Sequence, residues 1–549
     1  MTFGLILFWG AVVVLVTFLI GGLAIVSRPA PEFGGHPKGL FVLFLAEMWE
    51  RFSYYGMRAL LIFYLVQHWL FTDSEASMVY GAYTALVYIT PVVGGYLADR
   101  YLGQRKAVLF GAILLTFGHF FMAFEGGGGQ ADPMINVFWL ALALIIVGSG
   151  FLKANISVIV GQLYPRTDPR RDPAYTIFYM GINVGAATAS IICGYLGQTH
   201  GWEYGFGLAG FGMLIGLLFF HFGKPLLLGK GEPPAPELLR APVGGIRREW
   251  LLYGVGLGMV ALCWALVQYQ DVVGWLLGIF GLALVSYVVG TAVLKLQPEE
   301  RDRIFAAMFL ILTSIIFWAL FEQAGSSLNL FTDRHVDRAG VEASMFQSIN
   351  AIYIILLAPL FASLWTLLGR RGMEPSTPMK FGLAVVQVGL GFLVLVWGAR
   401  SVGIDVPTPV IFIFLIYLLH TTGELCLSPV GLSAMNRLAP SHLAGLIMGT
   451  WFFAAATGNF ASGLIAAATG AEGVESATAG KDQVLDVYST VGWTAVAVGV
   501  GVMVIAPLIR KMMHLDTLRD DEGGGALLGQ EEAGETQAAG IHPATRPGG

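Results

Sequence analysis

Six ionisable or phenolic side chains interrupt an apolar stretch that runs from about residue 40 to residue 66. They are Glu47, Glu50, Arg51, Tyr54, Tyr55 and Arg58. Their spacing of i, i+3, i+4, i+7, i+8 and i+11 predicts one face of an α-helix. A charge at the centre of a bilayer costs at least about 2.5–3.5 kcal/mol, so such residues usually face an interior pathway and pair with one another. The face therefore predicts coupling to protons or to a charged solute.

Three further ionisable residues lie inside apolar stretches, namely Lys153, Glu322 and Glu424. Each has an alternative interpretation as a residue that reaches water at an interface or only fixes helix packing. Glu322 lies closest to a predicted span end, so this alternative applies most to Glu322. Counted with the helix face above, the interior charges are Arg51, Arg58 and Lys153 against Glu47, Glu50, Glu322 and Glu424. This excess of one carboxylate predicts mutual pairing, with one group left to load and release a proton near neutral pH.

The composition places these residues in a polytopic membrane protein. Of 549 residues, 56% are hydrophobic and 12% are charged, and the mean hydropathy is +0.70. Soluble domains carry roughly 25% charged residues. About fifteen apolar runs reach the length of about 20 residues that spans a bilayer. They lie near residues 3–26, 40–66, 77–97, 106–124, 137–161, 174–197, 204–222, 250–269, 272–294, 304–324, 345–369, 380–399, 408–430, 442–468 and 488–510.

The order of these runs predicts an all-α chain with a duplicated six-helix unit. The expected parts are an extra N-terminal helix (1–27), a six-helix bundle (40–222), a flexible cytoplasmic linker (223–249), a two-helix hairpin (250–294), a second six-helix bundle (304–511) and a disordered cytoplasmic tail (520–549). The first run has a second interpretation, as a cleaved signal peptide or a start placed too far upstream. It lacks a basic n-region and a clear cleavage site, which favours a membrane helix with its N-terminus outside.

Lys and Arg residues are concentrated in alternate loops, beginning with the loop after the second core span. The positive-inside rule therefore predicts that the core helices begin and end in the cytoplasm. The net charge of −5 adds little about partners. The three cysteines, Cys193, Cys263 and Cys426, all lie in predicted spans and are expected to be small apolar packing residues rather than disulfide or metal ligands.

One basic loop contains Gly94-Gly-Tyr-Leu-Ala-Asp99-Arg100-Tyr-Leu-Gly-Gln-Arg105. It resembles the G-x-x-x-D-R-x-G-x-R loop of the major facilitator superfamily. Its glycines allow helices to approach closely, and the resemblance implies that Asp and Arg form cytoplasmic pairs between helices. The role expected for Gly94, Asp99, Arg100 and Arg105 is therefore conformational, without substrate contact.

Four further motifs resemble those of the proton-dependent oligopeptide transporters, the POT/PTR peptide transporter family. They are Glu47-x-x-Glu50-Arg51-Phe52-x-Tyr54-Tyr55-Gly56, Phe178-Tyr179-x-x-Ile182-Asn183-x-Gly185, Phe317-Trp318 with Glu322-Gln323, and Gly423-Glu424-Leu-x-x-Ser428-Pro429-x-Gly431. The resemblance runs from about residue 35 to residue 510 and includes the central hairpin of prokaryotic members. It implies a major facilitator fold. The helix at residues 2–26 lies outside the pattern.

The resemblance implies how a dipeptide or tripeptide is held. It assigns Arg51 and Lys153 to the peptide carboxylate, which an Arg can bind through a fork of donors. It assigns Glu424, Asn183 and Asn350 to the peptide amino terminus. Side-chain pockets would be lined by Tyr54, Tyr55, Trp318 and Trp451, although each aromatic taken alone is as readily a core or lipid-facing residue.

The resemblance also implies the proton coupling. It assigns proton handling to Glu47 and Glu50 with Lys153, and to Glu322, and it implies that Arg58 and Glu322 form a gating salt bridge between the two halves. Protonation of Glu322 would neutralise the pair and let the halves rock about a central site. The second core span, near residues 79–97, contains no histidine, so we expect the coupling to depend on carboxylates.

The sequence therefore predicts a proton-coupled symporter that imports di- and tripeptides across a bacterial inner membrane by alternating access. The expected partners are the peptide, protons and the bilayer, with no nucleic acid, no cofactor besides the coupling proton, and a monomer sufficient for function. Two alternatives remain open: a family member that carries another solute, such as nitrate or a peptide-like metabolite, and a non-transporting peptide sensor. The intact Glu424 favours peptides, because it suits an ammonium group and would repel an anion. The intramembrane residues contain no nucleophile–base pair that would indicate an enzyme.

Overall fold

The computed structural model describes residues 2–165, 168–440, 443–470 and 477–515. Fourteen of its helices are long and apolar enough to cross a membrane by length and composition. Helix α2 (Lys38–Gln67) is not one of these fourteen; it is 30 residues long and carries the charged face predicted above. Each of the fifteen apolar runs in the sequence overlaps a helix, so the all-α prediction is confirmed for the described residues.

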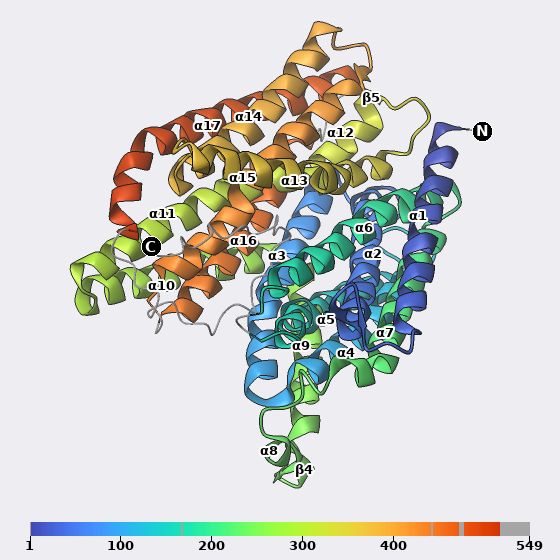
Figure 1. Ribbon diagram of the computed structural model, residues 1–549. Helices are drawn as coiled ribbons and strands as arrows, with labels where there is room; N and C mark the ends of the chain where they lie inside the picture. The colour runs from blue at the N-terminus through green and yellow to red at the C-terminus, as the bar shows by residue number, and fades with distance from the viewer. Residues whose placement is uncertain (1, 166–167, 441–442, 471–476, 516–549) are drawn as a thin grey trace.

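Two bundles of six long helices form the body of the molecule (Figure 1). The first bundle contains α2, α3 (Asp73–Leu97), α4 (Gln104–Met122), α5 (Ile135–Gln162), α6 (Arg171–Thr199) and α7 (Trp202–Phe222). The second contains α11 (Pro298–Phe321), α13 (Ser348–Arg370), α14 (Thr377–Ser401), α15 (Ile411–Leu438), α16 (Ala444–Ala468) and α17 (Ala477–Met512). In the first bundle α2 packs against α6 and α7, and in the second α14 packs against α15 and α17.

The span that begins with α11 is broken in the middle. A 3₁₀ turn, η3 (Glu322–Gly325), follows α11 and leads into α12 (Ser327–His335). The whole span covers 38 residues from Pro298 to His335. Glu322 therefore lies at the break inside the span with 1% of its surface exposed, and the prediction that it lies near a span end was wrong. The polar residues that follow Phe321 form a turn within the span, because the chain continues through η3 into α12.

A two-helix hairpin connects the bundles. It consists of α9 (Arg248–Gln268) and α10 (Gln270–Lys295). Helix α9 packs mainly against α5, whereas α10 contacts α11, α3 and α16. The hairpin thus touches both bundles, and most of its large apolar side chains face outward.

The segment before the hairpin is more ordered than predicted. It contains η2 (Lys224–Leu227), α8 (Pro236–Arg240) and a small hairpin of β3 (Pro242–Val243) and β4 (Ile246–Arg247). Arg105 Nε lies 2.7 Å from Glu232 Oε1, and the Gly231 amide donates to Gln162 Oε1 at 2.8 Å. These contacts hold the segment against the first bundle, so the expectation of a flexible linker was wrong.

The extra helix α1 (Phe3–Val26) packs on the flank of the first bundle against α6 and α2 (Figure 1). The Phe8 and Tyr195 rings lie 5.0 Å apart, and a Cβ atom at Gly22 would meet the Leu45 side chain at 2.7 Å. The connection to α2 contains β1 (Glu32–Phe33) and β2 (His36–Pro37). The expected disordered tail at residues 520–549 lies outside the described residues.

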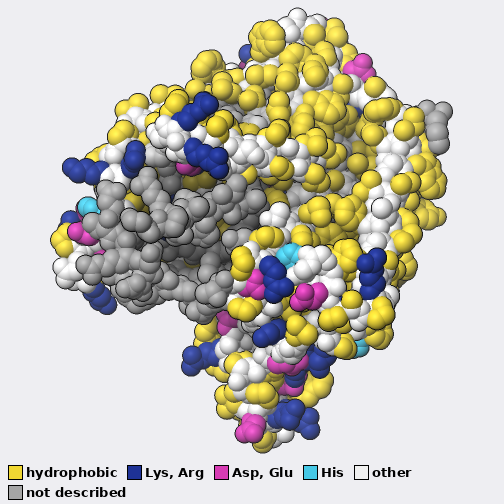
Figure 2. Space-filling model, in the orientation of Figure 1, with side chains coloured by type: hydrophobic (Ala, Val, Ile, Leu, Met, Phe, Trp, Pro, Cys, Tyr) yellow, Lys and Arg dark blue, Asp and Glu magenta, His cyan; other side chains and the backbone are white. Residues whose placement is uncertain are grey.

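The two ends of the bundles differ. We call the end that carries the loops after α3, α5 and α7 the basic end, and the other the opposite end. Figure 2 shows Lys and Arg side chains mainly over the left and lower parts of one face, whereas its upper and right parts are largely hydrophobic. Two short elements lie at the opposite end: η4 (Ala343–Gln347), and a parallel pair of β5 (Val336–Asp337) with β6 (Thr408–Pro409).

Candidate functional site

The charged face of α2 points into the first bundle, where its residues pair. Arg51 Nε lies 2.7 Å from Glu47 Oε1 and 3.3 Å from Glu50 Oε2. The three side chains have 3%, 1% and 0% of their surface exposed. Glu47 Oε2 and both carboxylate oxygens of Glu50 have no hydrogen-bond donor among the described residues. Burial with incomplete hydrogen bonding suits these carboxylates to bind a proton.

Glycines within the motifs set how closely α2 and α6 approach. A Cβ atom at Gly185 would lie 2.3 Å from the Met48 carbonyl oxygen, and one at Gly56 would lie 2.6 Å from Cys193 Sγ. Larger residues at either position would push the helices apart. The close approach places the charged face of α2 beside α6, which carries Asn183.

Lys153 on α5 lies beside the aromatic residues of the same interior. Its side chain is 4% exposed, and its Nζ lies 3.9 Å from the centroid of the Tyr54 ring and 5.8 Å from that of Tyr88. Such cation–π contacts orient an ammonium group. Tyr88 was not among the predicted site residues.

A buried ion pair joins the bundles. Arg58 on α2 is paired with Glu322 at the break after α11. Arg58 Nε also donates to the Tyr80 hydroxyl at 2.6 Å, and its guanidinium lies 5.7 Å from the centroid of the Tyr55 ring. Tyr80 was not among the predicted site residues either, although Tyr80 and Tyr88 recur on α3 at a spacing that places them on one face.

The second bundle contributes a carboxylate on α15. Asn350 Nδ2 donates to Glu424 Oε2 at 2.9 Å and to Thr421 Oγ1 at 3.0 Å. Glu424 is 1% exposed. The third residue assigned to this group, Asn183, is buried on α6, and its Nδ2 donates to the Tyr179 carbonyl of its own helix at 3.2 Å. The structure thus brings Asn350 to Glu424, with Asn183 bonded within the other bundle.

The two candidate tryptophans are buried in the second bundle. Trp318 on α11 is 6% exposed and lies 5.4 Å from the Phe321 ring. Trp451 on α16 is 5% exposed and lies 6.3 Å from the Phe381 ring. Both belong to the protein interior and not to the lipid-facing surface.

The loop after α3 includes a π-helical turn, η1 (Ala98–Leu102). A Cβ atom at Gly94 would lie 2.2 Å from the Gly150 carbonyl oxygen, so this position requires glycine for α3 to approach α5. Asp99 accepts a hydrogen bond from Gln104 within the loop at 2.8 Å, and Arg105 pairs with the linker residue Glu232. Asp99 and Arg100 form no ion pair between helices among the described residues, and the conformational role of this loop stays a prediction.

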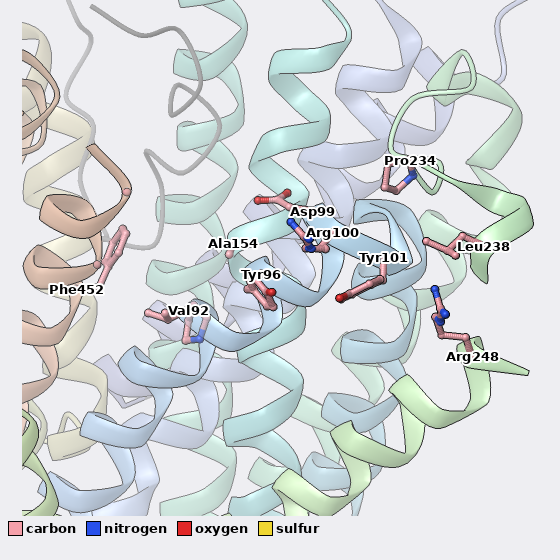
Figure 3. Close-up of a pocket in the computed structure, with 13 residues that line it drawn as sticks. Val92, Tyr96, Asp99, Arg100, Tyr101, Ala154, Pro234, Leu238, Arg248 and Phe452 are labelled. Atoms are coloured by element: carbon pink, nitrogen blue, oxygen red, sulfur yellow. The ribbon is translucent and has the colours of Figure 1, made fainter. Parts of the chain in front are cut away.

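A cavity of about 780 Å³ lies at the basic end, between the bundles. Its walls come from α3, the loop after α3, the linker, the start of α9, and α16 (Figure 3). In Figure 3, Val92 and Tyr96 of α3 lie across the gap from Phe452 of α16. Ala154 also lines the cavity, and it directly follows Lys153. The cavity therefore reaches the neighbourhood of the charged interior from the basic end.

At the opposite end the bundles are in contact. Arg334 Nη2 lies 2.8 Å from Asp73 Oδ1, and the Ser344 amide donates to Gln198 Oε1 at 3.0 Å. Among the described residues, the structure is therefore closed at the opposite end and has a cavity at the basic end. Open access from one side, with opposite charges on facing bundles, is an arrangement that can bind a small zwitterion and release it to that side.

Comparisons with known proteins agree with this architecture. The sequence profile of the POT family matches residues 105–481. The chain is 36% identical over 467 residues to the peptide transporter YePEPT of Yersinia enterocolitica, covering 79% of this chain and 88% of that protein. It is 33% identical to a di-/tripeptide transporter of Lactococcus lactis, covering 78% and 89%. A crystal structure of a mutant peptide transporter POT in complex with alafosfalin superposes with a TM-score of 0.76 at 34% identity, covering 90% of this chain and 99% of that one.

Proposed function

This chain belongs to the POT family of transporters, and from that membership we propose that it imports di- and tripeptides together with protons by alternating access. It is a multi-pass membrane transporter and not an enzyme. The observation that carries the proposal is the placement of a cationic group on one bundle and a carboxylate group on the other, around an interior that is open from one end. A peptide with both termini charged matches that arrangement.

The cationic group consists of Arg51 and Lys153. Arg51 is held by Glu47 and Glu50, which fixes its guanidinium, and Lys153 is held by the Tyr54 ring. A peptide carboxylate bound here would exchange solvation by water for charge-assisted hydrogen bonds. We propose these two residues as the carboxylate site.

The carboxylate group consists of Glu424 with its partner Asn350. Glu424 attracts a peptide ammonium, and the Asn350 carbonyl can accept a second N–H bond. Tyr54, Tyr55, Trp318 and Trp451 are proposed as pocket walls, with Asn183 contributing from the first bundle. Aromatic walls accept different side chains because their contact is largely apolar.

We propose that protonation of Glu322 weakens its ion pair with Arg58, and that Glu47 and Glu50 bind protons near the peptide. The Arg58–Glu322 pair connects the bundles only while Glu322 is ionised. Protonation removes the charge attraction in a buried setting, where that attraction is strongest. The bundles can then separate at this level.

The basic end is proposed to face the cytoplasm. The excess of Lys and Arg in the loops at this end follows the positive-inside pattern, and the relatives named above are bacterial. With this orientation the structure represents an inward-open state in a bacterial inner membrane, with α17 ending on the cytoplasmic side.

Uptake of a labelled dipeptide into proteoliposomes under an imposed proton gradient tests the function. We expect accumulation above the external concentration, collapse of that accumulation with a protonophore, and competition by unlabelled di- and tripeptides. Absence of uptake for every peptide in a broad panel, or uptake that ignores the gradient, would contradict the proposal.

A further inference from the structure

Buried hydrogen bonds surround the break between α11 and α12. Gln323, which directly follows Glu322 in η3, lies at their centre with 0% of its surface exposed. Its Nε2 donates to the Ala319 carbonyl at 3.0 Å and to the Ser462 carbonyl of α16 at 3.0 Å. Its Oε1 accepts a hydrogen bond from the hydroxyl of Ser327, the first residue of α12, at 2.6 Å. The second residue of the Glu322-Gln323 motif therefore joins α11, α12 and α16.

These hydrogen bonds end at Tyr488 on α17. Tyr488 Oη lies 2.8 Å from Ser327 Oγ, and the Tyr488 ring lies 4.9 Å from the Phe392 ring. The carbonyl oxygens beside Gln323 can only accept, so its amide nitrogen faces them and its amide oxygen faces Ser327. Because Ser327 gives its single hydroxyl hydrogen to Gln323, Tyr488 is the donor to Ser327. We call Gln323, Ser327, Ser462 and Tyr488 the η3 network.

The same segment contacts the first bundle on its other side. Glu322 pairs with Arg58, and Asn329 Nδ2 of α12 donates to the Ala59 carbonyl at 3.2 Å. Arg58 and Ala59 are adjacent on α2, so both contacts reach the same turn of that helix. Opening of the opposite end must break the contacts with α2, whereas the hydrogen bonds of the η3 network lie within the second bundle and can persist.

From this geometry we propose that Gln323, Ser327 and Tyr488 are positioning residues for the Glu322 carboxylate. A 3₁₀ turn has about three residues per turn, so adjacent side chains point about 120° apart. Holding the Gln323 side chain toward α16 and α17 therefore directs the Glu322 side chain toward Arg58 on α2. The use of this carboxylate for proton coupling rests on the function proposed above.

The η3 network matters because the carboxylate lies at a break in the helix. Regular backbone hydrogen bonds fix a residue inside a helix, whereas residues of a short turn depend more on side-chain partners. Removing the Ser327 hydroxyl takes the donor away from Gln323 Oε1 in a buried setting, which costs free energy. The turn then gains by reorienting, Glu322 faces Arg58 in fewer molecules, and the ion pair closes the opposite end less firmly.

The opening of the opposite end measures this positioning without any transport. Spin labels are attached to two exposed sites on different bundles, through Gln130→Cys and Ser401→Cys, and their distances are measured by double electron–electron resonance. We expect Ser327→Ala and Tyr488→Phe each to raise the ratio of open to closed molecules by about fivefold, the equivalent of one hydrogen bond of about 1 kcal/mol.

Ser363→Ala on α13 and Tyr287→Phe on α10 are the matched controls, because both side chains are exposed and lie outside the η3 network. They should leave the ratio of open to closed molecules unchanged. Unchanged distances in Ser327→Ala or in Tyr488→Phe, or equal opening in the controls, would overturn the proposal.

The same labels separate positioning of the carboxylate from a general loosening of the helices. In a Glu322→Gln background the charge attraction to Arg58 is already absent, so adding Ser327→Ala should open the end no further. A further fivefold opening, by about the same factor as in the unaltered background, would show that Ser327 acts through packing and not through Glu322. That result would also overturn the proposal.

Transport in proteoliposomes tests the consequence. Ser327→Ala should lower proton-driven dipeptide accumulation about fivefold, while the rate and KM of peptide counterflow stay unchanged. Equal losses of accumulation and counterflow would indicate a merely structural role and contradict the proposal. If the unaltered protein ignored the proton gradient, the proposed function would fail instead, and the spin-label distances would still decide whether the η3 network positions Glu322.

Discussion

Single side chains at the interface carry the connection between the bundles. Arg58 is held by two partners from different elements, Glu322 at the break after α11 and Tyr80 on α3. Because Tyr80 keeps one donor of Arg58 bonded, the guanidinium stays oriented when the carboxylate is neutralised. A single proton on Glu322 can therefore change the contact between the bundles while Arg58 keeps its hydrogen bond to Tyr80.

Glu322→Gln is expected to separate proton-driven accumulation from peptide counterflow. The amide keeps the shape of the side chain but cannot lose or gain a proton, so accumulation driven by a proton gradient should fall by at least about tenfold, a change of about 1.4 kcal/mol in coupling. Peptide counterflow, which needs no net proton movement, should persist. Uptake and counterflow in proteoliposomes check both. Full proton-driven accumulation by the variant would remove Glu322 from the coupling.

Lys153→Ala is expected to affect the peptide carboxylate selectively. The substitution removes the ammonium that lies over the Tyr54 ring, so binding of a dipeptide should weaken by about tenfold or more. Binding of the carboxyl-amidated dipeptide should change much less, because that ligand lacks the charge. Competition against a fluorescent dipeptide measures both affinities. Equal losses for the two ligands would indicate that Lys153 serves only helix packing.

Helices α3 and α16 form a close contact between the two bundles. Each helix presents a glycine to the other, and the helices diverge from that point toward the basic end. A contact of this kind allows the helices to pivot with little change in side-chain packing.

Gly463→Val is expected to disturb the pivot. A Cβ atom at Gly463 would lie 2.9 Å from Gly81 Cα and 2.9 Å from the Ser77 carbonyl oxygen, so backbone must shift. Overpacking of this kind typically costs about 1–3 kcal/mol, and the closed contact at the opposite end should weaken. Counterflow should slow and the unfolding temperature fall. Gly445→Val is the control, because a Cβ atom there meets nothing within 4 Å; equal effects of both would contradict the pivot.

The loop between α4 and α5, at the opposite end, contains Glu125, whose titration should make the stability of the protein depend on pH. Burial, together with the neighbouring Glu203 carboxyl, raises the pKa of Glu125 to about 7. The folded state then holds a proton that the unfolded chain releases near pH 4.5, so stability is greatest below that pH and decreases as the pH rises toward about 7. The unfolding temperature should show this decrease between pH 5 and 8, and Glu125→Gln should flatten it. The exposed Glu237→Gln should leave the profile unchanged; a flat profile in the unaltered protein would contradict the assignment.

At the scale of the whole molecule, the opposite end is closed by contacts that must break in every transport cycle. Asp73 at the start of α3 pairs with Arg334 at the end of α12, and Gln198 bonds Ser344. The Asp73–Arg334 pair is partly exposed, and exposed ion pairs contribute about 0–1 kcal/mol each. Packing of η4 on α6 and of α16 on α3 adds to the closure.

Cross-linking across this end is expected to stop transport. Asp73→Cys with Arg334→Cys, joined by a short reducible bifunctional reagent, should abolish dipeptide counterflow, and reduction should restore it. Each single variant treated in the same way is the control and should keep its activity. The three native cysteines are buried and should react slowly. Undiminished counterflow after complete cross-linking would contradict alternating access through the opposite end.

The long helices and the family were predictable from the amino-acid sequence. Continuous apolar runs force the backbone to satisfy its hydrogen bonds internally, so helix was predictable from length alone. The charged face of α2 was predictable as well, because a helical period of 3.6 residues places Glu47, Glu50 and Arg51 together whatever surrounds them.

Which groups from distant segments meet depends on the packing of the helices. The partner of Arg58 on α3, the bond of Asn350 to Glu424, and the break that puts Glu322 inside its span depend on how helices pack, and no local pattern records that packing. The structure of the linker was not predicted for the same reason. Its Gly and Pro content indicates a flexible backbone, whereas contacts with Arg105 and Gln162 of the first bundle hold the linker in place. The cavity is the clearest case, since Arg100, Arg248 and Phe452 belong to three segments that only the fold brings to one space.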